Sequence, residues 1–149
     1  MGTKRKQGRV PARRLECAAG KQQTPLMAAC AAGRLPLVKQ LVANGVNVND
    51  VNREGESALT YAVVWNQEAV VDYLLAVGAR PELPPAPAWS PLMYAAFEGN
   101  RHIGAALIAK GADVSRKDGH NRTAADIAGM AGHQGWAAMA GPAPARRRR

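Results

Sequence analysis

Residues 24–49 read TPLMAACAAGRLPLVKQLVANGVNVN, and this stretch predicts two short helices. Thr24 precedes an apolar run, where its hydroxyl can accept hydrogen bonds from the free N–H groups of a first helical turn. Pro25 suits the next position because that backbone nitrogen needs no partner. Gly33 and Gly45 can adopt the left-handed conformation that ends helices. We therefore predict helices over 25–32 and 35–43, each too short to be stable alone.

The same signals recur along the chain with a constant step of 33 residues. The residues that start the first helices are Thr24, Ser57, Ser90 and Thr123. The helix-ending residues are Gly33, Asn66, Gly99 and Gly132, and then Gly45, Gly78 and Gly111. The step predicts further first helices over 58–65, 91–98 and 124–131, and second helices over 68–77, 102–110 and 134–140. Because no pair can bury its apolar faces alone, the pairs must stack.

Two longer motifs and two repeat endings narrow the architecture. They are TPLMAA at residues 24–29 with Gly33, SPLMYAA at 90–96 with Gly99, GVNVN at 45–49 and GADV at 111–114. With these motifs the chain resembles the ankyrin-repeat family over roughly residues 20–140. The resemblance implies an all-α ankyrin-repeat solenoid, in which antiparallel helix pairs stack side by side and β-turn fingers project between the repeats.

The resemblance also predicts the domain organisation. A basic, largely flexible segment over 1–19 precedes the repeat domain over 20–140, and a Pro/Ala/Arg-rich disordered tail follows over 141–149. The repeats are expected at approximately 20–51, 52–84, 85–117 and 118–140, the last of them a reduced C-terminal cap. A helical turn over 15–20 is expected to cover the opposite edge of the array.

Two departures from the repeat pattern affect the expected packing. Four prolines within residues 81–87 remove backbone donors from the second finger and favour an extended strut. Gly104 lies in the middle of a predicted helix, where glycine costs about 1 kcal/mol relative to alanine. Trp136 is in register with the apolar residues at 37, 70 and 103, which predicts that it lies in the core. Core packing is also expected of Tyr61 and Tyr94, with their hydroxyls reaching the surface.

The 149-residue chain has a formal charge of +9, and that charge is concentrated at its ends. Residues 1–14 and 146–149 hold ten of the 20 lysines and arginines and none of the 11 acidic residues, so the body is near neutral. No apolar run has the length of a secretory signal or a membrane span, so no membrane role is expected. Two cysteines are too few for a disulfide framework, which predicts a cytoplasmic location, or a nuclear one in a eukaryotic cell.

The motifs give no support to catalysis or metal binding. The sequence has no nucleophile motif and no phosphate loop, and His102, His120 and His133 do not lie at metal-ligand spacing from one another or from a cysteine. We therefore expect no enzymatic activity, no cofactor and no metal. The resemblance instead implies a monomeric, non-catalytic module that binds a protein partner on its concave face as an adaptor, inhibitor or regulator.

Three of the seven aromatic residues fall at positions that ankyrin geometry places on the concave face. We interpret Trp65, Trp89 and Phe97 as an apolar patch for a protein partner, because exposed aromatic residues are typical of binding hot spots. The full set of predicted partner contacts is Arg53, Glu56, Val64, Trp65, Trp89, Phe97, Glu98, Arg122 and Met130. The alternative is structural: Trp89 covers the proline strut, and Trp65 packs onto Phe97 at the seam between repeats.

The basic ends allow a second functional hypothesis, a nucleic-acid-associated or nuclear regulatory factor. The residues concerned are Lys4, Arg5, Lys6, Arg13, Arg14, Arg146, Arg147, Arg148 and Arg149. They would contact nucleic acid or an acidic partner by charge alone, with a steep salt dependence and no base readout. Neither end contains an aromatic side chain for base stacking. The alternatives are solvated tails that aid solubility, or a nuclear-import signal in a eukaryotic cell.

Overall fold

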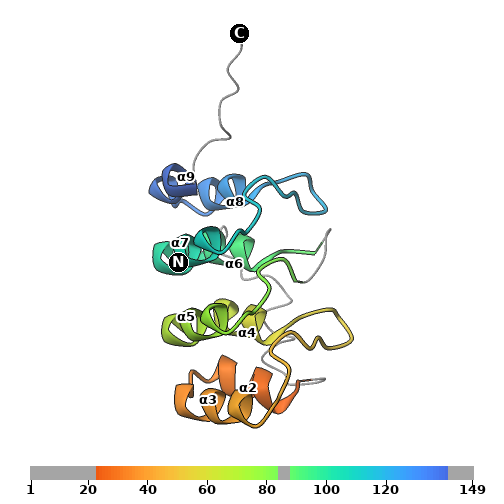
Figure 1. Cartoon of the computed structure of the whole chain (residues 1–149). Helices are drawn as coiled ribbons and strands as arrows, with labels where there is room; N and C mark the ends of the chain where they lie inside the picture. Colours follow the sequence, from red (N-terminus) through yellow and green to blue (C-terminus); the bar gives the residue numbers. More distant parts are fainter. Residues whose placement is uncertain (1–22, 84–87, 141–149) are drawn as a thin grey trace, which may run out of the picture.

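The computed structural model of the chain describes residues 23–83 and 88–140, which form four stacked helix pairs (Figure 1). The first helices of the pairs are α2 (Pro25–Ala31), α4 (Ala58–Val64), α6 (Pro91–Glu98) and α8 (Ala124–Met130). The second helices are α3 (Leu35–Ala43), α5 (Glu68–Ala76), α7 (Arg101–Ala109) and α9 (Gln134–Ala140). Each predicted boundary lies within one residue of the observed one. Helix α7 begins earlier than predicted because the Asn100 side chain accepts a hydrogen bond from the Ile103 N–H and caps it.

The four predicted starting residues occupy equivalent places in successive repeats. Each has extended backbone, and each side-chain oxygen accepts a hydrogen bond from the N–H three residues on. The first helices end at residues in the left-handed region, which include Asn66 with φ 56°. The units that repeat in the sequence therefore also share the same backbone conformation at these positions.

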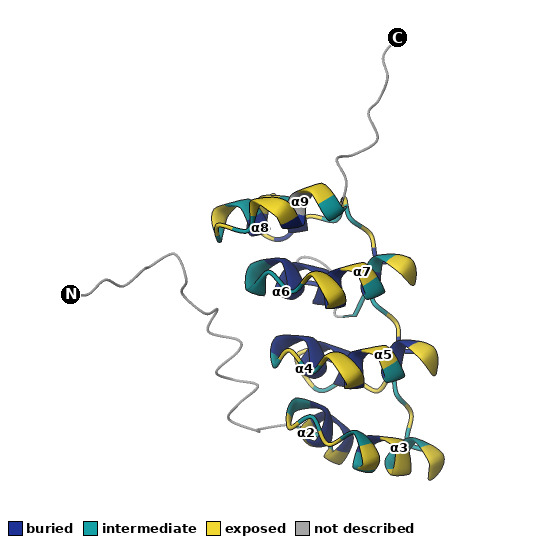
Figure 2. Ribbon diagram, turned by 90° about the vertical axis from the view of Figure 1, so that its left-hand side faces the viewer, coloured by how far each residue is buried: buried dark blue, intermediate teal, exposed yellow. Residues whose placement is uncertain are grey.

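The pairs are arranged so that like elements line up along the stack. In Figure 1 the first helices form one layer, the second helices form another, and the connections between repeats project as fingers on the side of the first helices. Figure 2 shows buried residues where neighbouring pairs meet and exposed residues around the outside. We call the side formed by the first helices and the fingers the finger face. Among the described residues, none of the helices is long and apolar enough to cross a bilayer.

The first and third fingers turn through matching backbone hydrogen bonds. The Asn52 N–H donates to the Glu56 carbonyl, and the Asp118 N–H donates to the Arg122 carbonyl at the same repeat position. The first finger also carries an isolated antiparallel bridge between Val51 and Ser57. Residues 84–87 of the second finger lie outside the described residues, so the extended strut stays a prediction there.

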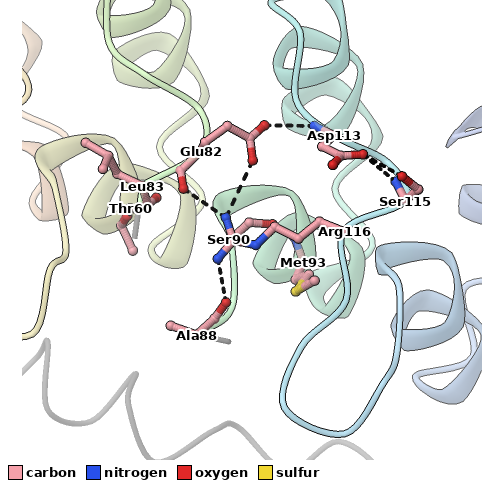
Figure 3. A network of polar contacts seen from close by, with 9 residues as sticks. All are labelled: Thr60, Glu82, Leu83, Ala88, Ser90, Met93, Asp113, Ser115 and Arg116. Atoms are coloured by element: carbon pink, nitrogen blue, oxygen red, sulfur yellow. Dashed lines mark hydrogen bonds and ion pairs between the residues drawn. The ribbon is translucent and has the colours of Figure 1, made fainter. Parts of the chain in front are cut away.

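The two ends of the second finger are joined by a side chain of the next repeat (Figure 3). Arg116 donates from Nη1 to the Glu82 carbonyl at 2.8 Å and from Nη2 to the Ala88 carbonyl at 2.7 Å. The carboxylate of Glu82 in turn accepts from the Asp113 N–H at 2.8 Å. The Arg116 side chain is only 9% exposed. One guanidinium therefore replaces the cross-finger backbone bonds seen in the other two fingers.

Gly104 has a packing role that its position in the sequence did not reveal. A Cβ atom at this residue would lie 2.8 Å from Cζ2 of Trp136 and 2.9 Å from Cε of Met139. Trp136 is fully buried, as predicted, and its Nε1 donates to the Asn100 carbonyl. The low helix propensity of Gly104 is therefore offset by packing, because the missing side chain makes room for the indole ring of the last repeat.

Candidate functional site

Trp89 lies at the centre of an aromatic cluster at the base of the second finger. Its ring packs edge-on against Tyr94, with centroids 5.0 Å apart, and tilted against Phe97 at 5.8 Å. The guanidinium of Arg122 lies 5.9 Å from the Trp89 ring centroid, within the range of a cation–π contact. Helix α6 supplies Tyr94 and Phe97, whereas Arg122 comes from the next finger. The cluster therefore joins two repeats.

Asp118 fixes the orientation of the Trp89 and Arg122 side chains in this cluster. Its Oδ2 accepts from Trp89 Nε1 at 2.9 Å and from Arg122 Nη2 at 2.7 Å, while its Oδ1 accepts from the backbone N–H groups of His120 and Arg122. Burial raises the pKa of the Asp118 carboxyl, but the hydrogen bonds from Arg122, His120 and Trp89 outweigh burial and hold that pKa well below its ordinary value. The group is thus a buried, fully bonded carboxylate.

Asp118 was not among the residues predicted for the site. It follows Asn52 by two repeat steps, and the Asn52 side chain accepts hydrogen bonds from the Glu54 and Glu56 N–H groups in the same way. An Asn or Asp at this repeated turn position is a signal that could have identified the finger turn. Its bond to the Trp89 indole is a contact between repeats that the spacing does not specify.

Several predicted contacts do keep accessible surface on the finger face. Trp65, Trp89, Phe97, Glu98 and Arg122 are half-buried, and Arg53 is exposed. Met130 is 61% exposed and occupies in α8 the place that Phe97 occupies in α6. The structure brings Phe97 and Arg122 each into contact with Trp89. Trp65 lies at the end of α4 in the preceding repeat and packs against the core.

Two of the predicted contacts are buried, so the prediction that they meet a partner is wrong. Val64 is 1% exposed and lies in α4, which packs between α2 and α6. Glu56 is 4% exposed, and its carboxylate accepts a hydrogen bond from Asn52 Nδ2 inside the first finger. Both side chains therefore stabilise the array and present no surface to another molecule.

The remaining residues considered in the sequence analysis are the basic residues near the termini, the cysteines and possible metal ligands. The basic residues singled out near the two termini lie within 1–22 and 141–149, outside the described residues, so their role stays a prediction. Cys30 is buried, and burial raises the pKa of its thiol to about 12. Within 23–83 and 88–140, no group of three or more His, Cys, Asp or Glu residues is placed to hold a metal ion.

Comparison with known proteins agrees with this geometry. The family profile described as "Ankyrin repeats (3 copies)" matches residues 10–85, and the profile of a single "Ankyrin repeat" matches residues 89–119. The chain belongs to the ankyrin-repeat family. Its all-α stack of helix pairs with projecting fingers is therefore an ankyrin solenoid, as the sequence motifs predicted.

The relatives of this ankyrin-repeat chain are diverse. It is 35% identical over 111 residues to the fission yeast "Glycerophosphocholine phosphodiesterase gde1", 40% identical over 93 residues to the "Putative ankyrin repeat protein YahD" of Escherichia coli, and 35% identical over 109 residues to the "Cyclin-dependent kinase inhibitor 2A" of Monodelphis domestica. These alignments cover 73%, 58% and 72% of the chain. They cover 10%, 46% and 63% of the relatives, so the chain spans less than two thirds of each one.

The similarity to the phosphodiesterase is carried by the repeats alone. Ankyrin repeats are typically non-catalytic and bind other proteins. What this chain shares with its relatives is therefore a protein-binding scaffold, and such a fold does not by itself name a partner.

Proposed function

We propose that this ankyrin-repeat protein is a non-catalytic regulator or adaptor that binds a protein partner on the concave, finger-bearing face of the array. The observation that carries the proposal is the group of accessible apolar side chains on that face: Trp65, Trp89, Phe97 and Met130. A relative named for kinase inhibition supports a regulatory role of this kind. A cytoplasmic location, or a nuclear one in a eukaryote, is part of the proposal.

The aromatic cluster is suited to binding because it is already ordered. Trp89 is held by the Asp118 hydrogen bond and by contacts with Tyr94 and Phe97, so little side-chain freedom remains to be lost when a partner binds. Aromatic residues and arginine are enriched among the residues that dominate binding energies, and Arg122 borders the Trp89 ring. The half-exposed rings thus offer a rigid apolar contact with a charged rim.

The experiment compares two accessible apolar residues on different faces. Met130→Glu places a charge on the proposed face, whereas Val77→Glu changes a 38% exposed residue at the end of α5, in the layer of second helices. Lysate from the source organism is passed over each immobilised variant, and the proteins retained by the wild type are quantified by mass spectrometry. We expect Met130→Glu to lose tenfold or more of a specific partner, and Val77→Glu to retain it.

Thermal melts of both variants provide the control for folding. A partner captured equally by the wild type and by both variants would place binding elsewhere and contradict the proposal. Phe97→Ala supplies a second readout, because it removes a half-buried ring without adding charge. Trp89 is less suitable, since its replacement would also leave buried Asp118 without one of its donors.

A further inference from the structure

The first repeat presents an apolar edge to solvent. Pro25 and Ala28 of α2 are exposed, and Leu37 and Leu41 of α3 are half-buried. We call these four residues the leading edge. Helices α2 and α3 form the pair at the end of the stack where the described chain begins (Figure 1).

The internal repeat shows what normally covers these four positions. The residues that follow Pro25 by whole repeat steps are Ala58, Pro91 and Ala124, and those that follow Ala28 are Tyr61, Tyr94 and Ile127. Those that follow Leu37 are Val70, Ile103 and Trp136, and Leu41 is followed by Leu74 and Leu107. All of these equivalents are buried. Each equivalent position lies in a pair that packs against a preceding pair, whereas α2 and α3 have no preceding neighbour among the described residues.

The direction in which the leading edge faces follows from Trp136. Trp136 is the equivalent of Leu37, and its ring packs over Gly104 of the preceding repeat while its Nε1 donates to the Asn100 carbonyl there. Leu37 accordingly faces the place that a preceding unit would occupy. A second element on this side would bury it as α7 buries Trp136.

The opposite edge of the array is built differently. Asp126 of α8 is exposed at the position where Met27, Thr60 and Met93 are buried, and its carboxylate accepts from the Thr123 N–H. A charged residue at this position suits contact with water and is typical of a terminal cap. The leading edge has no such polar replacement, which indicates that it is covered.

We propose that residues 10–20 of this chain occupy the leading edge and form its cap. The segment is joined to the edge through Gln23, and such a short tether gives it a high effective concentration there. Leu15, Ala18 and Ala19 are spaced three and four positions apart, which would place them on one face of a helical turn. The ankyrin profile also begins its match at residue 10, inside this segment.

The test measures proximity in the full-length protein. In a Cys30→Ala background, the remaining Cys17 lies in the proposed cap, and a second cysteine is introduced by Ala28→Cys on the leading edge. The matched control is Ala43→Cys, because Ala43, Ala76 and Ala109 are exposed in three successive repeats and so face no neighbour. A short bismaleimide should cross-link Cys17 within one chain at least tenfold faster in the Ala28→Cys protein than in the control.

Every other cross-linking result contradicts the proposal. Equal rates in the two proteins would mean that the segment diffuses near the array without packing on it. A cross-linked dimer in the Ala28→Cys protein would assign the edge to a second copy, and no cross-link in either protein would assign it to neither.

A stability measurement gives an independent readout. Leu15→Asp should lower the melting temperature of the full chain by about 4 °C or more, because it removes apolar burial at the leading edge. Thr3→Asp, which also adds a charge to the N-terminal segment but lies outside the proposed cap, should leave the melting temperature unchanged. Equal melting temperatures for the two variants would overturn the proposal.

Discussion

At the scale of single residues, Gly104 and Asp118 are residue types that are unusual in a helix interior and in a buried position. Gly104 lies within helix α7 and makes room for the Trp136 ring, while Asp118 places a carboxylate in a buried position where five donor groups bond to it. Each residue would be unfavourable when judged from helix propensity or burial alone. Gly104 is explained by the Trp136 ring of the next repeat, and Asp118 by donors from its own finger together with the Trp89 indole of the preceding repeat.

Replacing Gly104 with alanine should destabilise the protein although alanine is the better helix former. The added Cβ would lie 2.8 Å from the rigid Trp136 ring, and overpacking of this kind costs about 1–3 kcal/mol. The matched control is Gly129→Ala in α8, where no heavy atom lies within 4 Å of the added carbon. The control should gain about 0.5–1 kcal/mol. Urea unfolding measures both variants, and a gain at Gly104 would show that Trp136 moves freely.

Asp118 should make the stability of the protein depend on pH in acid. Its folded-state pKa is lowered, so the carboxylate stabilises the fold above its ordinary pKa of 3.8, and this stabilisation is lost as the pH falls below that value. Asp118→Asn should lower stability at pH 7 by about 1–3 kcal/mol and flatten the decline between pH 4 and pH 2. Urea unfolding free energies across that range test this, and parallel curves for the two proteins would contradict it.

At the scale of elements, the three fingers reach similar positions by different means. The first and third use a backbone turn supported by Asn52 or Asp118, whereas the second carries prolines that cannot donate backbone hydrogen bonds. Arg116 supplies the missing bonds from the next repeat (Figure 3). The second finger is therefore positioned by its neighbour, and Trp89 follows directly after the held carbonyl of Ala88.

Loss of the Arg116 guanidinium should loosen the second finger more than the rest of the array. Arg116→Met keeps the apolar stem but leaves the Glu82 and Ala88 carbonyls without these donors, which should cost about 1–3 kcal/mol. Hydrogen exchange should accelerate at residues 82–83 and 88–90. The neighbouring exposed Lys117→Met serves as the control and should change neither quantity. Acceleration spread evenly over all repeats would mean that Arg116 stabilises the stack and not the finger.

At the scale of the whole molecule, stability depends on contacts between neighbouring repeats. Each helix pair is too short to be stable alone, and neighbouring pairs cover its buried residues, on both sides for the two inner pairs and on one side for the first and last (Figure 2). Position in the stack therefore decides exposure. Val64 is buried within the stack, whereas Met130, at the equivalent position in the last pair, is exposed.

Truncation of the Trp136 side chain should destabilise the last repeat more than the other repeats. Trp136→Ala removes a fully buried ring and should cost about 3–5 kcal/mol. In a linear array this loss should appear first at α8 and α9, while α4 and α5 keep their hydrogen-exchange protection. Exchange measured by peptide mass spectrometry distinguishes the two regions, and a uniform loss of protection would show that the array unfolds as one unit.

The local signals in the sequence determined the repeat, the helix starts and the helix ends. Hydroxyl caps and left-handed residues act within a few residues of the chain, so a single sequence is sufficient to locate them. The core positions of Tyr61, Tyr94 and Trp136 were also predicted correctly from the register of the repeat. The expectation that the Tyr61 hydroxyl reaches the surface is wrong, because this residue is 1% exposed and its hydroxyl accepts a hydrogen bond from Asn52 Nδ2. For the candidate site, the ankyrin resemblance predicted that Trp65, Trp89 and Phe97 lie on the concave face. All three are half-buried and pack against the core, and their contact with a partner stays a prediction.

Only the tertiary structure decided which of those positions another repeat covers. Val64 and Glu56 share the register of accessible residues and are nevertheless buried, Val64 within the stack and Glu56 within its own finger. The contacts of Trp89 with Asp118, of Arg116 with the second finger and of Gly104 with Trp136 all join residues about one repeat apart. Such contacts depend on how two units are placed in space, and a pattern confined to each unit does not contain that placement.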